Sequence, residues 1–144
     1  MKNWWRRFKK WLSLPNADKW LLLQAIAVIL LIKLGLKLLS FKSFKTVYAH
    51  CIANPSAKNY PTSYIKQLVW SVGVVSSALP MSILCLPQAL AVKFFLRGDD
   101  GFVLKIGVAN PVQQFSAHAW IEKEGKIVIG DVPNVSYVPL WDWN

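Results

Sequence analysis

The sequence has few of the residues that form metal centres, disulfide frameworks and phosphate-binding loops. Its 144 residues include only two cysteines, Cys51 and Cys85, and two histidines, His50 and His118. No CxxC pair is present and the histidines lie far apart, so we expect no metal site. There is no P-loop or other glycine-rich phosphate motif, so we expect no ATP site and no cofactor. No secretory context supports a disulfide, but the sequence leaves a bond between the two cysteines open.

The chain also lacks an apolar run of the length that a membrane span needs. The longest run, residues 20–32, has 13 residues and lies between Lys19 and Lys33, whereas a spanning helix needs about 20. Nineteen residues precede the run and lysines follow it, so we do not expect a secretory signal. A buried or interfacial helix fits this segment better than a single span. We therefore expect a cytoplasmic protein, with membrane association left open.

Acidic residues are scarce, and the positive charge is concentrated near the N-terminus. The chain has 17 Lys and Arg against seven Asp and Glu, and residues 1–45 carry +9 of its net +10, with Asp18 as their one acid. Such a segment suits an anionic surface, whether lipid, nucleic acid or acidic protein. The lysines could equally extend around a packed core. Because aliphatic runs separate the basic residues, we expect no nucleic-acid binding, and peripheral membrane contact through residues 1–45 stays open.

The spacing of apolar residues predicts an α+β protein, with helices first and strands later. We expect helices at about residues 4–12, 18–39, 41–53, 62–78 and 83–96. We expect strands at residues 102–108, 116–125 and 126–131, and a short fourth strand at 135–140. The proline- and asparagine-containing segment 54–63 is the clearest linker. It predicts a basic helical N-terminal region, residues 1–53, followed by a core of residues 62–144.

Three residues of the core are candidate catalytic groups. Proline is tolerated only in the first turn of a helix, so Pro87 places Cys85 at a helix N-terminus. The helix dipole and free N–H groups there stabilise a thiolate and can bind an oxyanion. Taken singly, each candidate has an ordinary explanation. A free cysteine is often a buried hydrophobe, His118 could be a core residue, and Asp131 could cap a strand end.

Together the three residues form an arrangement that a cysteine nucleophile can use. His118 lies on one expected strand, and Asp131 ends the strand that pairs with it across the turn at residues 123–126. Residues equally far from that turn face each other, so His118 and Asp131 are expected side by side, with a slip of one residue left open. His118 would deprotonate Cys85 and later protonate the leaving amine. Asp131 would orient the imidazole.

Two stretches carry a family resemblance that spans about residues 80–140. They are CLPQALAVKFFLRGDDGFVLKIGV and FSAHAWIEKEGKIVIGD, and together they resemble the transglutaminase-like domain of lasso-peptide biosynthesis B proteins. The matching positions are Cys85-Leu86-Pro87, Ala89-Leu90-Ala91, Ile106-Gly107-Val108, Ala117-His118-Ala119-Trp120-Ile121-Glu122, Gly125 and Asp131. Val92 and the DDG turn depart from the family pattern. The placement of the acid varies more in this family than that of Cys and His.

The resemblance implies a transglutaminase-like, papain-like core in which a catalytic helix packs on a small antiparallel sheet. It also implies a leader peptidase that cleaves a ribosomally made precursor, with Cys85, His118 and Asp131 as the catalytic triad. In that family the leader is delivered by a separate recognition protein, and a cyclase then closes the ring with ATP. The precursor peptide, the recognition protein and the lasso cyclase are therefore the expected partners.

The neighbours of His118 are candidate substrate-binding residues. His118, Trp120 and Glu122 alternate along the strand and should share one face. Trp120 could wall the substrate cleft or pack in the core, and Ser116 is small enough to leave room for a peptide backbone. Two rival functions stay open. One is a transglutaminase-like acyltransferase that uses the same thiol, and the other is a non-catalytic adaptor at a membrane surface.

Overall fold

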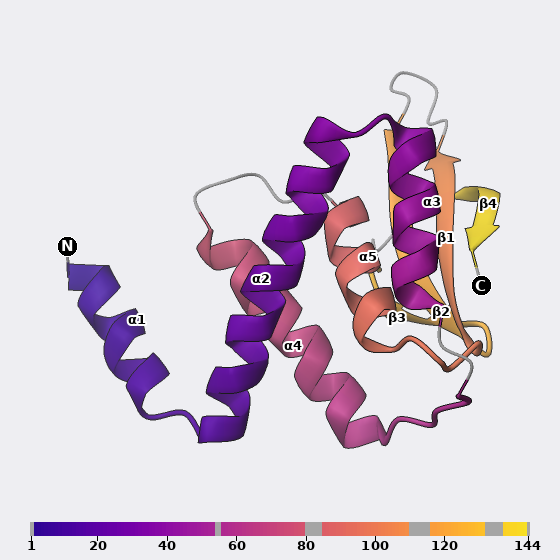
Figure 1. The fold of residues 1–144 in the computed structure, drawn as a ribbon. Coiled ribbons are helices and arrows are strands. Elements are labelled where there is room, and N and C mark those ends of the chain that lie inside the picture. Colours follow the sequence, from indigo (N-terminus) through magenta and orange to yellow (C-terminus); the bar gives the residue numbers. More distant parts are fainter. Residues whose placement is uncertain (1, 54–55, 80–84, 110–115, 132–136, 144) are drawn as a thin grey trace.

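The computed structural model describes residues 2–53, 56–79, 85–109, 116–131 and 137–143 (Figure 1). Within these ranges the chain forms five helices followed by four strands. The helices are α1 (Lys2–Leu12), α2 (Asn16–Leu38), α3 (Phe41–Ile52), α4 (Thr62–Ala78) and α5 (Cys85–Phe95). The strands are β1 (Phe102–Ala109), β2 (Ser116–Lys123), β3 (Lys126–Ile129) and β4 (Val138–Trp143).

All five expected helices are present, and the local sequence explains where several of them begin. α2 and α4 start directly after Pro15 and Pro61; a residue before proline avoids the helical region, so neither helix extends back through its proline. α3 is capped by Ser40, whose hydroxyl accepts a hydrogen bond from the Ser43 N–H at 3.3 Å. α1 and α2 each begin two residues before the expected position. Residues 83–84 of the last expected helix lie outside the described residues.

The four strands form one antiparallel sheet in the order β3-β2-β1-β4. The expected hairpin between β2 and β3 is confirmed. Its turn places Glu124 and Gly125 at φ values of 51° and 76°, the left-handed region that tight hairpin turns require. Both strands are two residues shorter than expected: β2 ends at Lys123 and β3 ends at Ile129.

The fourth strand lies further along the chain than expected and pairs with β1. Its alternation continues to the C-terminal tryptophans, whose rings pack against α3. The ring of Trp141 lies 6.0 Å from that of Phe41, and the ring of Trp143 lies 5.0 Å from that of Tyr48. These aromatic contacts extend the strand beyond the expected end at residue 140. Residues 135–136 of the expected strand lie outside the described residues.

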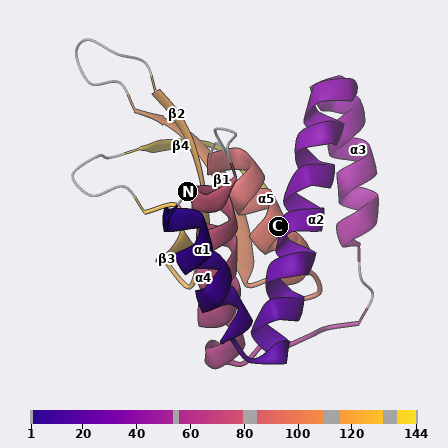
Figure 2. The ribbon, with the colours of Figure 1, turned by 90° about the vertical axis from the view of Figure 1, so that its left-hand side faces the viewer.

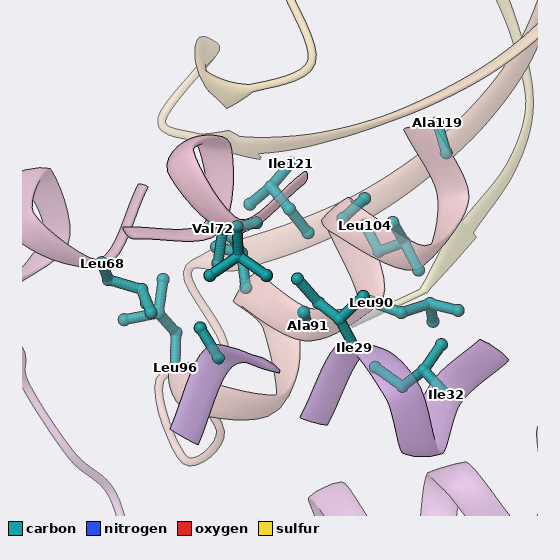
Figure 3. Packing of buried hydrophobic residues seen from close by; sticks show 14 of the residues in the cluster. Ile29, Ile32, Leu68, Val72, Leu90, Ala91, Leu96, Leu104, Ala119 and Ile121 are labelled. Carbon is teal, nitrogen blue, oxygen red and sulfur yellow. The ribbon is translucent and has the colours of Figure 1, made fainter. Parts of the chain in front are cut away.

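α5 lies at the centre of the molecule, between the sheet and the other helices (Figure 1). It packs on β1 and β2 on one side and against α2 and α4 on the other. Its residues 89–92 are at most 1% exposed, as expected of an apolar segment that is covered on both sides. Figure 3 shows Leu90 and Ala91 of α5 beside Ile29 of α2 in this core. The structure is therefore an α+β fold with its central helix packed on an antiparallel sheet.

The N-terminal helices contribute to the same core. Leu22, Ala25 and Ile29 of α2 are buried in one cluster with Leu68 of α4 and Leu90 of α5. This cluster packs α5 between the other helices and the sheet. The division into a helical N-terminal region, residues 1–53, and a core of residues 62–144 stays a prediction.

Candidate active site

Cys85 is the first residue of α5, and its thiol is free and partly exposed. Pro87 occupies the first turn, where its missing N–H breaks no hydrogen bond of the helix. Cys51 is also free and is exposed on α3, so in this structure the two cysteines are not bonded to each other. The first-turn N–H groups of a helix have no partner within it, so the backbone next to Cys85 offers donors to a developing oxyanion.

His118 lies on β2, and three groups hold its half-buried ring. Its Nε2 is 2.5 Å from the carbonyl oxygen of Gly130. A carbonyl only accepts hydrogen bonds, so Nε2 carries the proton and donates, and the lone pair of the neutral ring is on Nδ1. The ring centroid lies 4.9 Å from that of Tyr137 and 6.2 Å from that of Trp120. These contacts fix both the orientation and the tautomer that a general base needs.

Only glycine fits the position that provides this carbonyl. Gly130 has a φ of +91°, in the region that residues with side chains rarely adopt. A Cβ atom there would lie 2.8 Å from the carbonyl oxygen of Ala119 and 2.9 Å from Cβ of Trp120. The chain after β3 therefore passes directly against the backbone of β2, and this close approach brings the Gly130 carbonyl to His118.

Cys85 and His118 line the same cavity, which has a volume of about 310 Å³. Gln88 and Ala89 of α5 form one wall with Cys85, and the end of β3 forms another. His118 shares a sheet face with Trp120, whereas Ala119 is buried in the core beneath α5. Both Cys85 and His118 are described, and no direct hydrogen bond joins them. Catalytic hydrogen bonds are often long before substrate binds and shorten in the complex.

Asp131 also lines this cavity, but it does not pair with His118 as expected. The register between β2 and β3 shifts by one residue between Ile121 and Glu122, and β3 ends at Ile129. This shift is the slip of one residue that the sequence left open, and it displaces Asp131 along the strand relative to His118. Within the described residues no hydrogen bond or ion pair joins Asp131 to His118, and the carboxylate is exposed. A catalytic role for Asp131 stays a prediction.

Trp120 is buried behind His118 rather than exposed in the cavity. Its side chain is 5% exposed, and its Nε1 donates to Oε1 of Glu122 at 2.7 Å. The other carboxylate oxygen of Glu122 lies 3.0 Å from Nζ of Lys105. The Trp120 N–H and then the Lys105 ammonium lower the pKa of Glu122. The ring also lies close to the backbone of Gly107, since a Cβ there would be 2.7 Å from it.

The substrate-binding roles expected of Trp120 and Ser116 stay predictions. Ser116 begins β2 opposite Ala109, and its side chain lies outside the described part of the chain. Trp120 packs beside the His118 ring on the same sheet face. A packing role was one of the two roles that the sequence left open for it.

Sequence reasoning missed several residues of this site, among them Gln88, Gly130 and Tyr137. Gln88 follows Cys85 by three residues on a helix, a spacing that places both on one face and could have identified it. Gly130 sits between the expected strand and the acid, and its glycine was a signal for a special backbone conformation. Tyr137 has no such signal, because its approach to His118 depends on the path of the chain between β3 and β4.

The site can therefore support nucleophilic catalysis by a thiol. It combines a cysteine at a helix N-terminus, a histidine with its lone pair on Nδ1, and backbone N–H groups for an oxyanion. Among the described residues no group of three His, Cys, Asp or Glu side chains is placed to hold a metal ion.

The sequence matches one known protein family. Residues 28–142 match the model of the transglutaminase-like superfamily, and this range contains Cys85, His118 and Asp131. The superfamily includes cysteine proteases and acyltransferases. Comparisons with curated proteins and with solved structures each gave no match. Because the family match covers well over half of the chain, the protein belongs to the transglutaminase-like superfamily.

Proposed function

We propose that the protein is a cysteine endopeptidase that removes the leader from a lasso-peptide precursor. The observation that carries this proposal is the shared cavity of Cys85 and His118, with Nε2 of His118 engaged by Gly130 and Nδ1 left for the thiol. The CLP and AHAW stretches, which resemble lasso-peptide B proteins, support the choice of substrate. The superfamily supports thiol chemistry on an acyl group.

In the first half of the reaction, Nδ1 of His118 takes the proton of the Cys85 thiol. The thiolate attacks the carbonyl at the junction of leader and core, and N–H groups at the start of α5 receive the oxyanion. As the tetrahedral intermediate collapses, the C–N bond breaks and His118 gives its proton to the leaving amine. The core peptide departs with a free N-terminus, and the leader is held on Cys85 as a thioester.

In the second half, water replaces the departed amine. His118 takes a proton from that water, the hydroxyl oxygen bonds to the thioester carbon, and the C–S bond breaks. The leader leaves with a carboxylate, and Cys85 is regenerated. The new N-terminal amine of the core is the group that a lasso cyclase would join in the ring, so the cyclase and a separate leader-binding protein are the proposed partners.

The sheet offers a way to align an extended precursor with this cavity. β3 is an edge strand, and its end contributes Ile129 to the cavity wall. An extended peptide that adds beside an exposed strand edge gains main-chain hydrogen bonds. A precursor bound along β3 would carry its backbone towards Cys85, which fits an enzyme that reads a leader peptide.

Mass spectrometry of a lasso precursor incubated with the protein and the leader-binding partner tests this proposal. We expect a hydrolysed leader and a free core peptide, and near-complete loss of both with Cys85→Ala. Cys51→Ala is the matched control, because it removes the other free thiol and should leave cleavage intact. A crosslinked or otherwise acylated product would instead identify an acyltransferase. Unchanged function with Cys85→Ala would identify a non-catalytic adaptor.

A further inference from the structure

α2 exposes an apolar stripe along one side. With 3.6 residues per turn, its six exposed large side chains fall within about 100° of the helix circumference and therefore lie on one face. They are Trp20, Leu23, Leu30, Leu31, Leu34 and Leu38, which are 41–70% exposed. We call these six residues the α2 stripe. At 1.5 Å per residue it is about 27 Å long, and contiguous exposed apolar surface of this kind marks an interaction site.

The opposite side of α2 is committed to the core. Leu22, Ala25, Ile29 and Ile32 are at most 6% exposed and pack with α4 and α5. Although Lys33 and Lys37 interrupt its apolar sequence, α2 as a whole is long and apolar enough to cross a membrane. Its most apolar window has a mean hydropathy of 2.2, and 28% of that window is buried. To cross a membrane, α2 would have to separate its buried face from α4 and α5. Contact through the α2 stripe alone leaves the fold intact.

α1 adds a second apolar face with basic residues opposite it. Trp5, Phe8 and Leu12 are 43–61% exposed and follow one another at helical spacing. Arg6 and Lys10 lie on the other side of the helix by the same spacing. α1 projects from the helical layer in Figure 1 and lies at the outside of the molecule in front of α4 in Figure 2. A short helix with aromatic residues on one face and basic ones on the other suits the plane of a membrane interface.

We propose that α1 and the α2 stripe bind the surface of a membrane that contains anionic lipid. The charge favours this occupant, since residues 1–45 carry +9. Their one acid, Asp18, accepts a hydrogen bond from the Gln67 amide. Basic residues at an anionic surface each contribute about 1 kcal/mol, which is about fivefold in affinity. Exposed apolar side chains and a basic helix in the same N-terminal region match acyl chains beneath anionic headgroups better than they match an acidic protein.

Co-sedimentation of the full chain with lipid vesicles tests this surface without using peptide cleavage, so its result is independent of the proposed enzymatic function. We expect binding to vesicles of phosphatidylcholine with phosphatidylglycerol, and much weaker binding to phosphatidylcholine alone. Added salt should weaken the first interaction, because it screens the charges. Absence of binding to the anionic vesicles would overturn the proposal and leave a protein partner as the occupant.

Two charge variants separate a local surface from net charge. Replacing three basic residues of α1 with glutamine, as Arg6→Gln, Lys9→Gln and Lys10→Gln, should weaken vesicle binding about a hundredfold, at about fivefold per residue. The matched control removes three exposed lysines outside residues 1–45, as Lys58→Gln, Lys66→Gln and Lys126→Gln. It lowers the net charge equally and should weaken binding far less. Equal losses in the two variants would contradict the proposed surface.

An apolar variant and an extraction step test how the chain sits in the lipid. Replacing Leu31 and Leu34 together with serine, as Leu31→Ser and Leu34→Ser, should weaken vesicle binding by about tenfold for each leucine. Each substitution removes a leucine side chain that binding would bury in the lipid. Both residues are exposed, so the fold should be retained. Alkaline carbonate should release the bound protein from the vesicles. Retention after carbonate would show a spanning helix and overturn contact through the surface.

Discussion

Gly130→Ala should damage the active site through the backbone rather than through a side chain of the site. The new Cβ would lie 2.8 Å from the Ala119 carbonyl oxygen, in a residue whose φ is +91°. The left-handed conformation costs about 1–2 kcal/mol for alanine, and relieving the contact costs about 1–2 kcal/mol more. We therefore expect the free energy of unfolding to fall by about 2–4 kcal/mol. The relief must move the Gly130 carbonyl away from Nε2 of His118.

The matched control for this variant is Gly125→Ala. Gly125 also has a positive φ, of 76°, but a Cβ added there would have no atom within 4 Å. The substitution should cost about 1–2 kcal/mol of stability from the backbone alone. It should leave the His118 ring and the activity of the folded protein unchanged.

Steady-state kinetics on a cleavable precursor, below the melting temperature of each variant, measure the effect. We expect Gly130→Ala to lower kcat at least about tenfold with little change in KM, because the misaligned group is a base that works in the transition state. Nitrogen NMR of the His118 ring should show Nε2 protonated in the wild type and a mixture of tautomers in the variant. A folded Gly130→Ala protein with wild-type kcat and tautomer would refute the positioning role.

Two further substitutions test the surroundings of the site and the core. Glu122→Gln should cost about 1 kcal/mol at neutral pH. The Trp120 N–H and Lys105 lower the pKa of Glu122 in the folded protein. The stabilisation that ionised Glu122 contributes is therefore present above its pKa in the unfolded chain. It is lost as the pH falls through its lower pKa in the folded protein. In the acidic range the melting temperature of the variant should therefore depend less on pH than that of the wild type. An equal dependence in the two proteins would contradict this expectation. Ile29→Ala should lower the free energy of unfolding by about 2–5 kcal/mol in denaturant titrations, because Ile29 is 0% exposed. Leu31→Ala, at an exposed position of the same helix, should change the free energy of unfolding by less than about 0.5 kcal/mol. Equal losses in the two variants would contradict the assignment of a buried and an exposed face to α2.

Much of the fold could be predicted because its elements have local signals. Prolines before α2 and α4, glycine in the β2–β3 turn and the change from helical to alternating periodicity are all visible in the sequence. Pro87 also locates Cys85 at a helix N-terminus from the sequence alone. These signals work because they act through φ angles and hydrogen bonds within a few residues.

The details that decide the site depend on contacts between distant segments. The register shift at Ile121 has no local signal, and it moves Asp131 out of register with His118. A backbone carbonyl, that of Gly130, takes the hydrogen bond instead, and carbonyls have no residue-type signature in a sequence. β4 could not be paired with β1 from its own pattern, because its position depends on the tryptophan contacts to α3.

The central claim is that His118 activates Cys85, and the rate of alkylation of Cys85 tests it most directly. In a Cys51→Ala background only one thiol reacts, and the rate can be measured at neutral pH with and without His118→Ala. An unassisted thiol is only a few per cent thiolate there. We predict that His118→Ala slows alkylation about tenfold while circular dichroism shows a folded protein. Equal rates in the two folded proteins would contradict the claim.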